Sequence, residues 1–110
     1  MIAQRGGRIV NVASVAGIYG IRDMVDYSLT KGAIISFTTG LAREVGEYNI
    51  TVNAVSPGNI NTYNDLPELS YMNRSGTPEE CANVIAFLAS DEASFVSGSN
   101  YVVDGSRKKI

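Results

Sequence analysis

Three short segments of the chain are rich in β-branched residues and are closed by turn-forming residues: residues 8–13, 50–55 and 100–104. Short apolar runs bounded by glycine, serine or proline are typical of β-strands. The first two runs are predominantly apolar, which is typical of strands covered on both faces. We therefore predict three strands, of which the first two are buried.

Two longer segments between these runs show helical periodicity. Within residues 26–47, steps of three and four place a set of side chains on one face: Tyr27, Lys31, Ile34, Thr38, Leu41 and Val45. The second helix is predicted to begin after Thr77, with Pro78 in its first position and Glu80 completing a capping box. Its apolar stripe follows at helical spacing: Cys81, Val84, Ile85 and Leu88. Strands that alternate with long helical crossovers predict an α/β fold with a parallel sheet.

Composition and charge narrow the possible functions. The 110 residues suffice for one domain, and a net charge of −2 gives no electrostatic reason to expect nucleic acid as a partner. The basic tail of Arg107, Lys108 and Lys109 is expected to be a solvated terminus. With one cysteine and no histidine, we expect neither a disulfide nor a metal site, and Cys81 is expected to be a core residue. The chain lacks the roughly 20 apolar residues of a membrane span and the apolar core of a signal peptide, so we expect a cytoplasmic protein.

A second face of the helix at residues 26–47 carries small residues at steps of four, namely Gly32, Ser36 and Gly40. A glycine in a helix interior costs about 1 kcal/mol relative to alanine, so a compensating contact is expected. Small residues allow another helix to approach closely, and we predict that this face packs across a subunit interface in a homo-oligomer. The alternative is a pair of glycines that the helix merely tolerates.

Tyr27 and Lys31 are one helical turn apart at the start of this helix, so their side chains are neighbours on its surface. Such a pair alone is a weak indication of a site, because exposed contacts of this kind are common. Ser14, however, directly follows the first strand, and the turn Pro57-Gly58 follows the second. Serine and Pro-Gly at strand ends are most often only turn residues. Because the carboxyl ends of parallel strands form the ligand crevice of an open α/β sheet, we expect a hydroxyl, a phenol, an ammonium and a backbone turn to meet there.

Several motifs, in this order, resemble the short-chain dehydrogenase/reductase family: GRIVNVASVAG, YSLTK, VNAVSPGNINT, GTPEE and FLASDEASFVSG followed by VVDG. The Tyr-x-x-x-Lys motif is unspecific alone, but its combination with Ser14 and the downstream motifs is specific. The resemblance covers nearly all of the chain. It implies a partial doubly wound parallel sheet, the second half of a Rossmann fold with about three strands and two main helices. It also implies an NAD(P)-dependent oxidoreductase that interconverts a secondary alcohol and a ketone by hydride transfer.

The resemblance further implies roles for individual residues. Ser14 would orient the substrate carbonyl or hydroxyl, and Tyr27 would be the general acid/base. Lys31 would bind the nicotinamide ribose and favour the ionised form of the phenol. The segment after the second strand would contact the cofactor, NAD or NADP, through Pro57, Gly58 and Ile60 at the nicotinamide and Thr62 at the pyrophosphate.

The glycine-rich turn of a dinucleotide-binding fold, G-x-G-x-x-G, is not found among the eleven glycines. Residues 17–20 have part of this spacing, but they follow a different strand and are expected to form a loop. In the family, the phosphate-binding strands, the residue that selects NAD or NADP and an asparagine of the proton relay come earlier and have no counterpart here. We therefore expect residues 1–110 to be a single incomplete Rossmann-type domain: a truncated gene product, the product of a misassigned start codon, or a fragment. On its own it is expected to bind NAD(P) poorly and to expose the edge of its first strand.

Two functions stay open at this point. One is an oxidoreductase, or its catalytic half, and the other is a non-catalytic remnant that acts as an oligomerisation or interaction module through the helix at residues 26–47. The cover over the expected site is short, because only residues 63–75 separate Thr62 from Gly76. Four residues of this segment are expected either to contact substrate or to pack within the loop: Tyr63, Leu66, Leu69 and Tyr71.

Overall fold

Three parallel strands form the central layer of the structure, a computed structural model that describes residues 1–62 and 64–108. The strands are β1 (Gly7–Val12), β2 (Ile50–Pro57) and β3 (Asn100–Val103), and they lie in the order β1-β2-β3. β1 pairs along most of β2, whereas β3 pairs only with the carboxyl-terminal half of β2. The predicted parallel α/β sheet is thus confirmed, and the strand bounds differ from the predicted ones by at most two residues.

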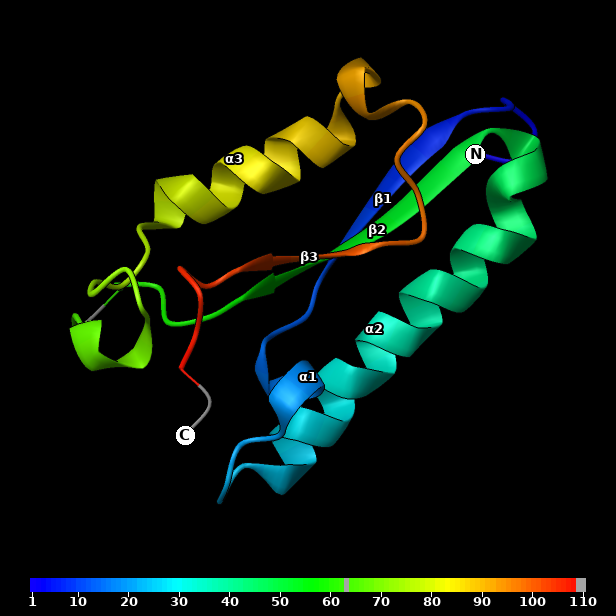
Figure 1. Ribbon diagram of the computed structural model, residues 1–110. Coiled ribbons are helices and arrows are strands. Elements are labelled where there is room, and N and C mark those ends of the chain that lie inside the picture. The colour runs from blue at the N-terminus through cyan, green and yellow to red at the C-terminus, as the bar shows by residue number, and fades with distance from the viewer. Residues whose placement is uncertain (63, 109–110) are drawn as a thin grey trace.

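Helices cover both faces of this sheet (Figure 1). α2 (Val25–Val45) lies along one face and α3 (Pro78–Ala89) along the other, which confirms both predicted helices. The remaining elements are short: α1 (Ala16–Tyr19) and the 3-10 turns η1 (Gly46–Tyr48), η2 (Pro67–Leu69) and η3 (Asp91–Ala93). Within the described ranges, none of the helices combines the length and apolar character needed to cross a membrane.

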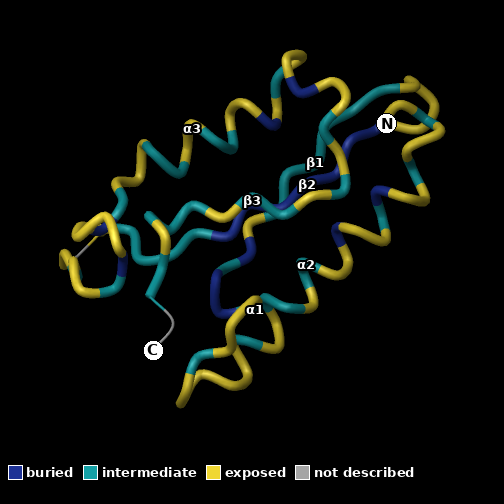
Figure 2. Tube along the Cα trace, in the orientation of Figure 1, coloured by how far each residue is buried: buried dark blue, intermediate teal, exposed yellow. Residues whose placement is uncertain are grey.

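The main apolar core lies between α2 and the sheet. Its buried members are Ala42, Ile50 and Val52, and the side chains packed against them are Ile9, Leu41, Val45 and Tyr48. β2 is buried along almost all of its length (Figure 2). β1 lies on one side of it, β3 and the segment before β3 lie on the other, and a helix covers each face. The prediction of a buried first strand is wrong: β1 pairs with one strand only, is half-buried, and ends at Val12, which is 47% exposed.

The start of α3 is fixed by the capping box that the sequence predicts. The backbone N–H of Glu80 donates to Thr77 Oγ1 at 3.2 Å, and the backbone N–H of Thr77 donates to Glu80 Oε1 at 2.9 Å. Arg74 adds an ion pair of 2.7 Å to the same carboxylate. The hydrogen bonds from Arg74 and from the Thr77 backbone lower the pKa of Glu80 to about 2. On the inner side of α3, Leu88 is fully buried and Cys81 is half-buried, and this burial raises the pKa of the Cys81 thiol.

α1 and α2 approach each other through glycine. A Cβ atom added at Gly17 would lie 2.6 Å from the backbone nitrogen of Gly32 and 2.6 Å from the carbonyl carbon of Lys31. The expectation of a loop at residues 17–20 is therefore wrong, since most of this segment is a short helix whose backbone rests on α2. The small-residue face is divided by this contact: Gly32 serves packing within the chain, while a Cβ at Gly40 would meet no atom within 4 Å. A subunit interface stays a prediction for the exposed part of that face.

Candidate active site

The segment after β1 carries Ser14 to the carboxyl end of the sheet. The backbone N–H of Val15 donates to Pro57 O at 3.1 Å, so the pairing with β2 continues beyond β1 itself. Ser14 Oγ accepts a hydrogen bond of 3.1 Å from the backbone N–H of Ala16 at the start of α1. A hydroxyl that accepts in this way still has its own hydrogen to donate. Ser14 is therefore a positioned donor at the edge of the sheet.

The first two turns of α2 hold Tyr27 and Lys31 side by side. The Lys31 ammonium nitrogen lies 5.6 Å from the centre of the Tyr27 ring. It also donates a hydrogen bond of 3.3 Å to the backbone carbonyl of Val12, the last residue of β1. The ammonium is thus anchored to the sheet, while Tyr27 is 42% exposed and accessible to a ligand.

A hollow of about 240 Å³ opens at the carboxyl ends of the strands. The segment after each strand contributes to it: Ser14 follows β1, Gly58 follows β2, and Arg107 follows β3. Tyr27, in the first turn of α2, lines it as well. The remaining lining residues are mostly apolar: Val15, Ala16, Ile21, Met24, Asn59 and Leu69. The structure therefore brings the serine, the tyrosine and the Pro-Gly turn to one hollow, with the lysine beside the tyrosine.

The turn after β2 comes close to the end of β3. The backbone N–H of Gly58 donates to Val103 O at 2.9 Å, and a Cβ at Gly58 would lie 2.6 Å from the Cβ of Asp104. Only glycine fits this approach without moving the neighbouring backbone. Beyond the turn, Ile60 pairs with Gly76, so the two ends of the cover segment are tied together.

Other residues predicted for the site lie around the hollow rather than in its wall. Lys31, Pro57 and Ile60 are half-buried, Thr62 is exposed, and none of the four lines the hollow. In the cover segment, Leu69 lines the hollow and Leu66 is half-buried, whereas Tyr71 is exposed. Tyr63 lies outside the described residues. The cover thus contributes one apolar side chain to the site.

Arg107 is the charged lining residue that the sequence pattern did not predict, besides the apolar Val15, Ala16, Ile21 and Met24. The basic tail was expected to be solvated, but Arg107 and Lys108 are both half-buried, so this expectation is wrong for them; Lys109 lies outside the described residues. The backbone N–H of Lys108 donates to Leu69 O at 2.9 Å, which holds the tail against the cover segment. No local pattern signals such a contact, because the two partners are far apart in the chain.

A second hollow, of about 360 Å³, lies between the end of β3 and the start of α3. It contains none of the residues predicted for the site. Its Arg74 side chain already forms an ion pair with Glu80. Among residues 1–62 and 64–108, no group of three histidine, cysteine or carboxylate side chains is arranged to hold a metal ion. The hollow at Tyr27 is therefore the candidate active site.

Parallel strands with helices on both faces and a hollow at their carboxyl ends define the class of open α/β proteins that bind ligands at this edge. A family model described as enoyl-(acyl carrier protein) reductase matches residues 1–106. The 3-oxoacyl-(acyl-carrier-protein) reductase of Thermotoga maritima is 46% identical, with an alignment that covers 96% of this chain and 47% of that protein. The chain belongs to the short-chain dehydrogenase/reductase family, as its motifs imply.

Further relatives agree with this assignment. Cyclohexanol dehydrogenase of an Acinetobacter species is 43% identical, with 96% of this chain and 45% of that protein covered. A solved structure assigned as a betaketoacyl-ACP reductase is 37% identical and superposes with a TM-score of 0.91 over 96% of this chain and 48% of its own. By name these relatives are oxidoreductases, and the chain spans about half the length of the curated relatives it matches.

Proposed function

We propose that this chain carries the catalytic residues of an NAD(P)-dependent oxidoreductase that interconverts a secondary alcohol and a ketone. The observation that carries the proposal is the convergence of Ser14 and Tyr27 on one hollow, with the Lys31 ammonium 5.6 Å from the tyrosine ring. A hydrogen-bond donor, a phenol that carries a proton and a fixed positive charge are together able to promote carbonyl reduction. Relatives named as reductases and dehydrogenases support the same reaction class.

The residues beside the hollow fit a nicotinamide cofactor, which when bound supplies or accepts the hydride. Lys31 has three N–H donors and uses one of them on the Val12 carbonyl, so two are left for ribose hydroxyls. Gly58 presents bare backbone at the hollow, where a flat ring can approach. The exposed hydroxyl of Thr62 is available to a pyrophosphate oxygen.

Tyr27 is the residue that would transfer the proton. In reduction its phenol would give a proton to the carbonyl oxygen, and in oxidation the phenolate would take it back. The Lys31 ammonium, held beside the ring by its bond to the Val12 carbonyl, would place a positive charge next to the reacting groups. The Ser14 hydroxyl would donate to the same substrate oxygen as negative charge develops on it. The alkyl parts of the lining, such as Met24 and Leu69, would cover the rest of a small ketone.

The test is replacement of Tyr27 by phenylalanine. Because the chain spans about half the length of its relatives, turnover of NAD(P)H with ketones is measured on the chain alone and on a fusion to the N-terminal half of the Thermotoga relative. Tyr27→Phe should lower turnover by about 10²–10⁴-fold, the usual contribution of a general acid/base, and leave cofactor affinity nearly unchanged. Lys31→Met should damage both. Tyr71→Phe is the matched control, since Tyr71 is exposed and does not line the hollow. Turnover retained by Tyr27→Phe would refute the proposal.

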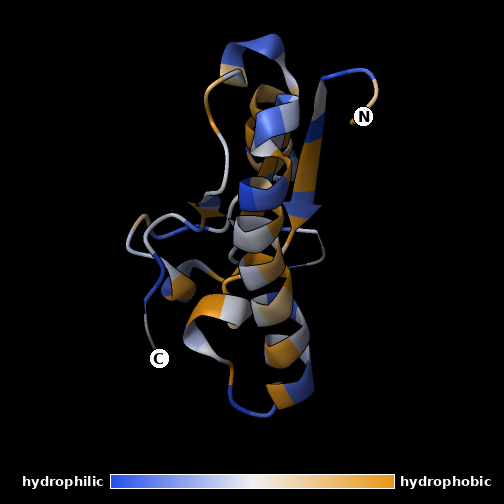
Figure 3. Cartoon of the chain, turned by 90° about the vertical axis from the view of Figure 1, so that its right-hand side faces the viewer, coloured by the Kyte–Doolittle hydropathy of each residue, from blue (hydrophilic) through white to orange (hydrophobic). Residues whose placement is uncertain are grey.

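A second candidate function, an interaction module, is favoured by the outer face of α2. Leu29 is 73% exposed and Phe37 is 59% exposed on this helix, and Figure 3 shows apolar residues along its outward side, giving way to hydrophilic ones near its C-terminal end. We propose that this face joins copies of the chain, in addition to any catalysis. Leu29→Glu with Phe37→Glu should then shift the mass measured by light scattering toward the monomer. An unchanged mass would remove this candidate.

A further inference from the structure

The chain reverses direction after β3, and this reversal brings Arg107 to the candidate active site. Gly105 and Ser106, which follow the strand, have positive φ angles of 61° and 63°. The returning segment then pairs with the cover segment: the N–H of Tyr71 donates to Ser106 O at 2.9 Å. On the other side of Arg107, the N–H of Lys108 donates to Leu69 O at 2.9 Å. The backbone around Arg107 is therefore fixed by hydrogen bonds on both sides of the residue.

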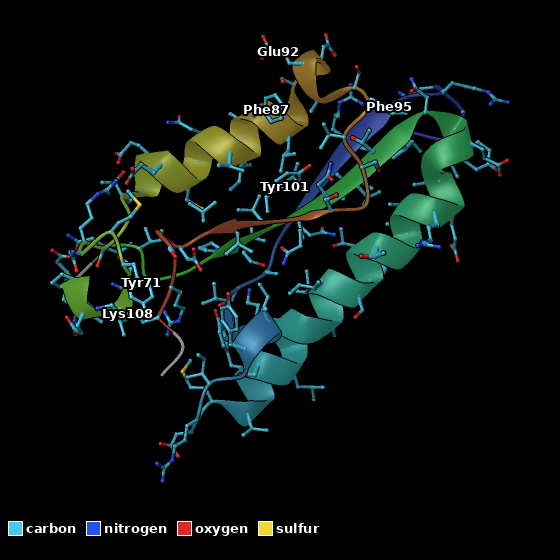
Figure 4. The ribbon with its side chains drawn as sticks, in the orientation of Figure 1. Tyr71, Phe87, Glu92, Phe95, Tyr101 and Lys108 are labelled. Atoms are coloured by element: carbon cyan, nitrogen blue, oxygen red, sulfur yellow. The ribbon has the colours of Figure 1, made fainter. Side chains whose placement is uncertain are left out.

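The two cations of this segment have different surroundings. Neighbouring residues of an extended, paired segment point to opposite sides. The ammonium of Lys108 lies 5.1 Å from the centre of the Tyr71 ring, and Figure 4 shows these two residues close together. Arg107 instead lines the hollow that also holds Tyr27. The charge of Lys108 is thus matched by an aromatic face, whereas Arg107 borders the candidate site.

The hollow offers Arg107 no opposite charge. Among its described lining residues Arg107 is the only charged one, and the others are apolar or neutral. Within residues 1–62 and 64–108, no ion pair or side-chain hydrogen bond involves Arg107, although the residue is half-buried. A partly desolvated guanidinium without a partner is unfavourable, and a bound anion removes that cost. Arginine is also the side chain best shaped to hold a carboxylate, through two parallel N–H donors.

We infer that Arg107 selects substrates that carry a carboxylate in addition to the reacting carbonyl or hydroxyl, so that the site takes oxo acids and hydroxy acids. This inference rests on the proposed function, because Tyr27 defines where the reacting oxygen lies. One end of the substrate meets Tyr27 and Ser14, and its carboxylate meets Arg107 across the hollow. Arg107 is then a residue that sets specificity and takes no part in proton transfer.

The experiment compares charged and neutral ketones of the same shape. Dissociation constants of 4-oxopentanoate, 5-oxohexanoate and their methyl esters are measured by NMR titration of the full chain, with NAD(P)H turnover recorded separately. The better acid should bind about tenfold more tightly than its ester, as expected for a charge-assisted pair. Arg107→Gln should reduce this ratio to about one, and Arg107→Lys should keep part of it. Lys108→Gln is the matched control, because it removes the same charge from the adjacent residue and should leave the ratio unchanged.

Two outcomes would overturn the inference. The first is that the wild-type chain binds acid and ester equally, or binds neither. The second is that Lys108→Gln loses as much of the preference for the acid as Arg107→Gln does. That result would mean that the acid is attracted by general positive charge and not by Arg107 itself. Selective binding without turnover counts against the proposed function alone, since binding preference does not require the hydride step. Tyr27→Phe should keep the preference and lose turnover, which separates the two roles.

Discussion

Replacing Gly17 by alanine should force α1 away from α2. The added Cβ would lie 2.6 Å from Gly32 N and Lys31 C and 2.8 Å from Lys31 O, all of them backbone atoms of a helix. Non-bonded carbon contacts are normally about 3.5–4.0 Å long, so the two helices would have to separate by about 1 Å. Overpacking of this kind costs about 1–3 kcal/mol, and alanine recovers part of this through its helix propensity. We expect a net loss of about 1–2 kcal/mol in the free energy of unfolding.

Gly40→Ala is the matched control for this change. It makes the same chemical substitution in a helix, but its Cβ would meet no atom within 4 Å. Alanine should therefore stabilise the chain by about 1 kcal/mol. In thermal unfolding followed by circular dichroism, 1 kcal/mol corresponds to about 4–8 °C for a domain of this size. The melting temperature should fall in Gly17→Ala and rise in Gly40→Ala.

Gly17→Ala should also lower turnover. Gly17 lies in α1, whose first N–H, that of Ala16, donates to Ser14 Oγ, and it lies against the backbone of Lys31. A shift of α1 therefore changes the distance between the serine and the tyrosine–lysine pair. A displacement of 1 Å at a site can cost about 10²-fold in rate. If Gly17→Ala melts at the wild-type temperature and keeps wild-type turnover, the close approach of the two helices does not hold the site as described.

Three further changes test the elements around the site. Thr77→Ala removes the hydroxyl that caps α3 and should lower the free energy of unfolding by about 1 kcal/mol in urea denaturation, whereas Thr77→Ser should be close to wild type. The pKa of Glu80 is about 2 in the folded chain against an ordinary 4.5, so its stabilising contribution is complete above about pH 4.5 and is lost as the pH falls through about 2. Urea denaturation across this range should show a smaller acid loss for Glu80→Gln than for wild type; equal losses would contradict the assignment. Gly58→Ala places a Cβ 2.6 Å from Asp104 Cβ and should weaken NAD(P)H binding in fluorescence titration of the fusion with the N-terminal half of the Thermotoga relative, while Gly46→Ala, which meets no atom within 4 Å, should not.

Local spacing was sufficient where both partners of an interaction lie within one or two helical turns. The capping box of Thr77 and Glu80 forms within a single turn of chain, so reading the residue types three positions apart predicted it correctly. The neighbourhood of Tyr27 and Lys31 follows from the pitch of a helix in the same way. The parallel sheet was also predictable, because three short apolar runs separated by long crossovers permit few other arrangements.

By itself, then, the sequence determined the order and type of the main elements, the family to which the chain belongs, and the presence of Ser14, Tyr27 and Lys31 near the strand ends. Only the tertiary structure decided that β1 is half-buried, that Gly17 rests on the backbone of α2, and that Arg107 lines the hollow. The physical reason is the same in each case: burial and contact depend on which distant segments meet in space. The periods of 3.6 residues in a helix and 2 residues in a strand show which residues of the same element share a face. They contain no information about which residues of distant segments pack against that face.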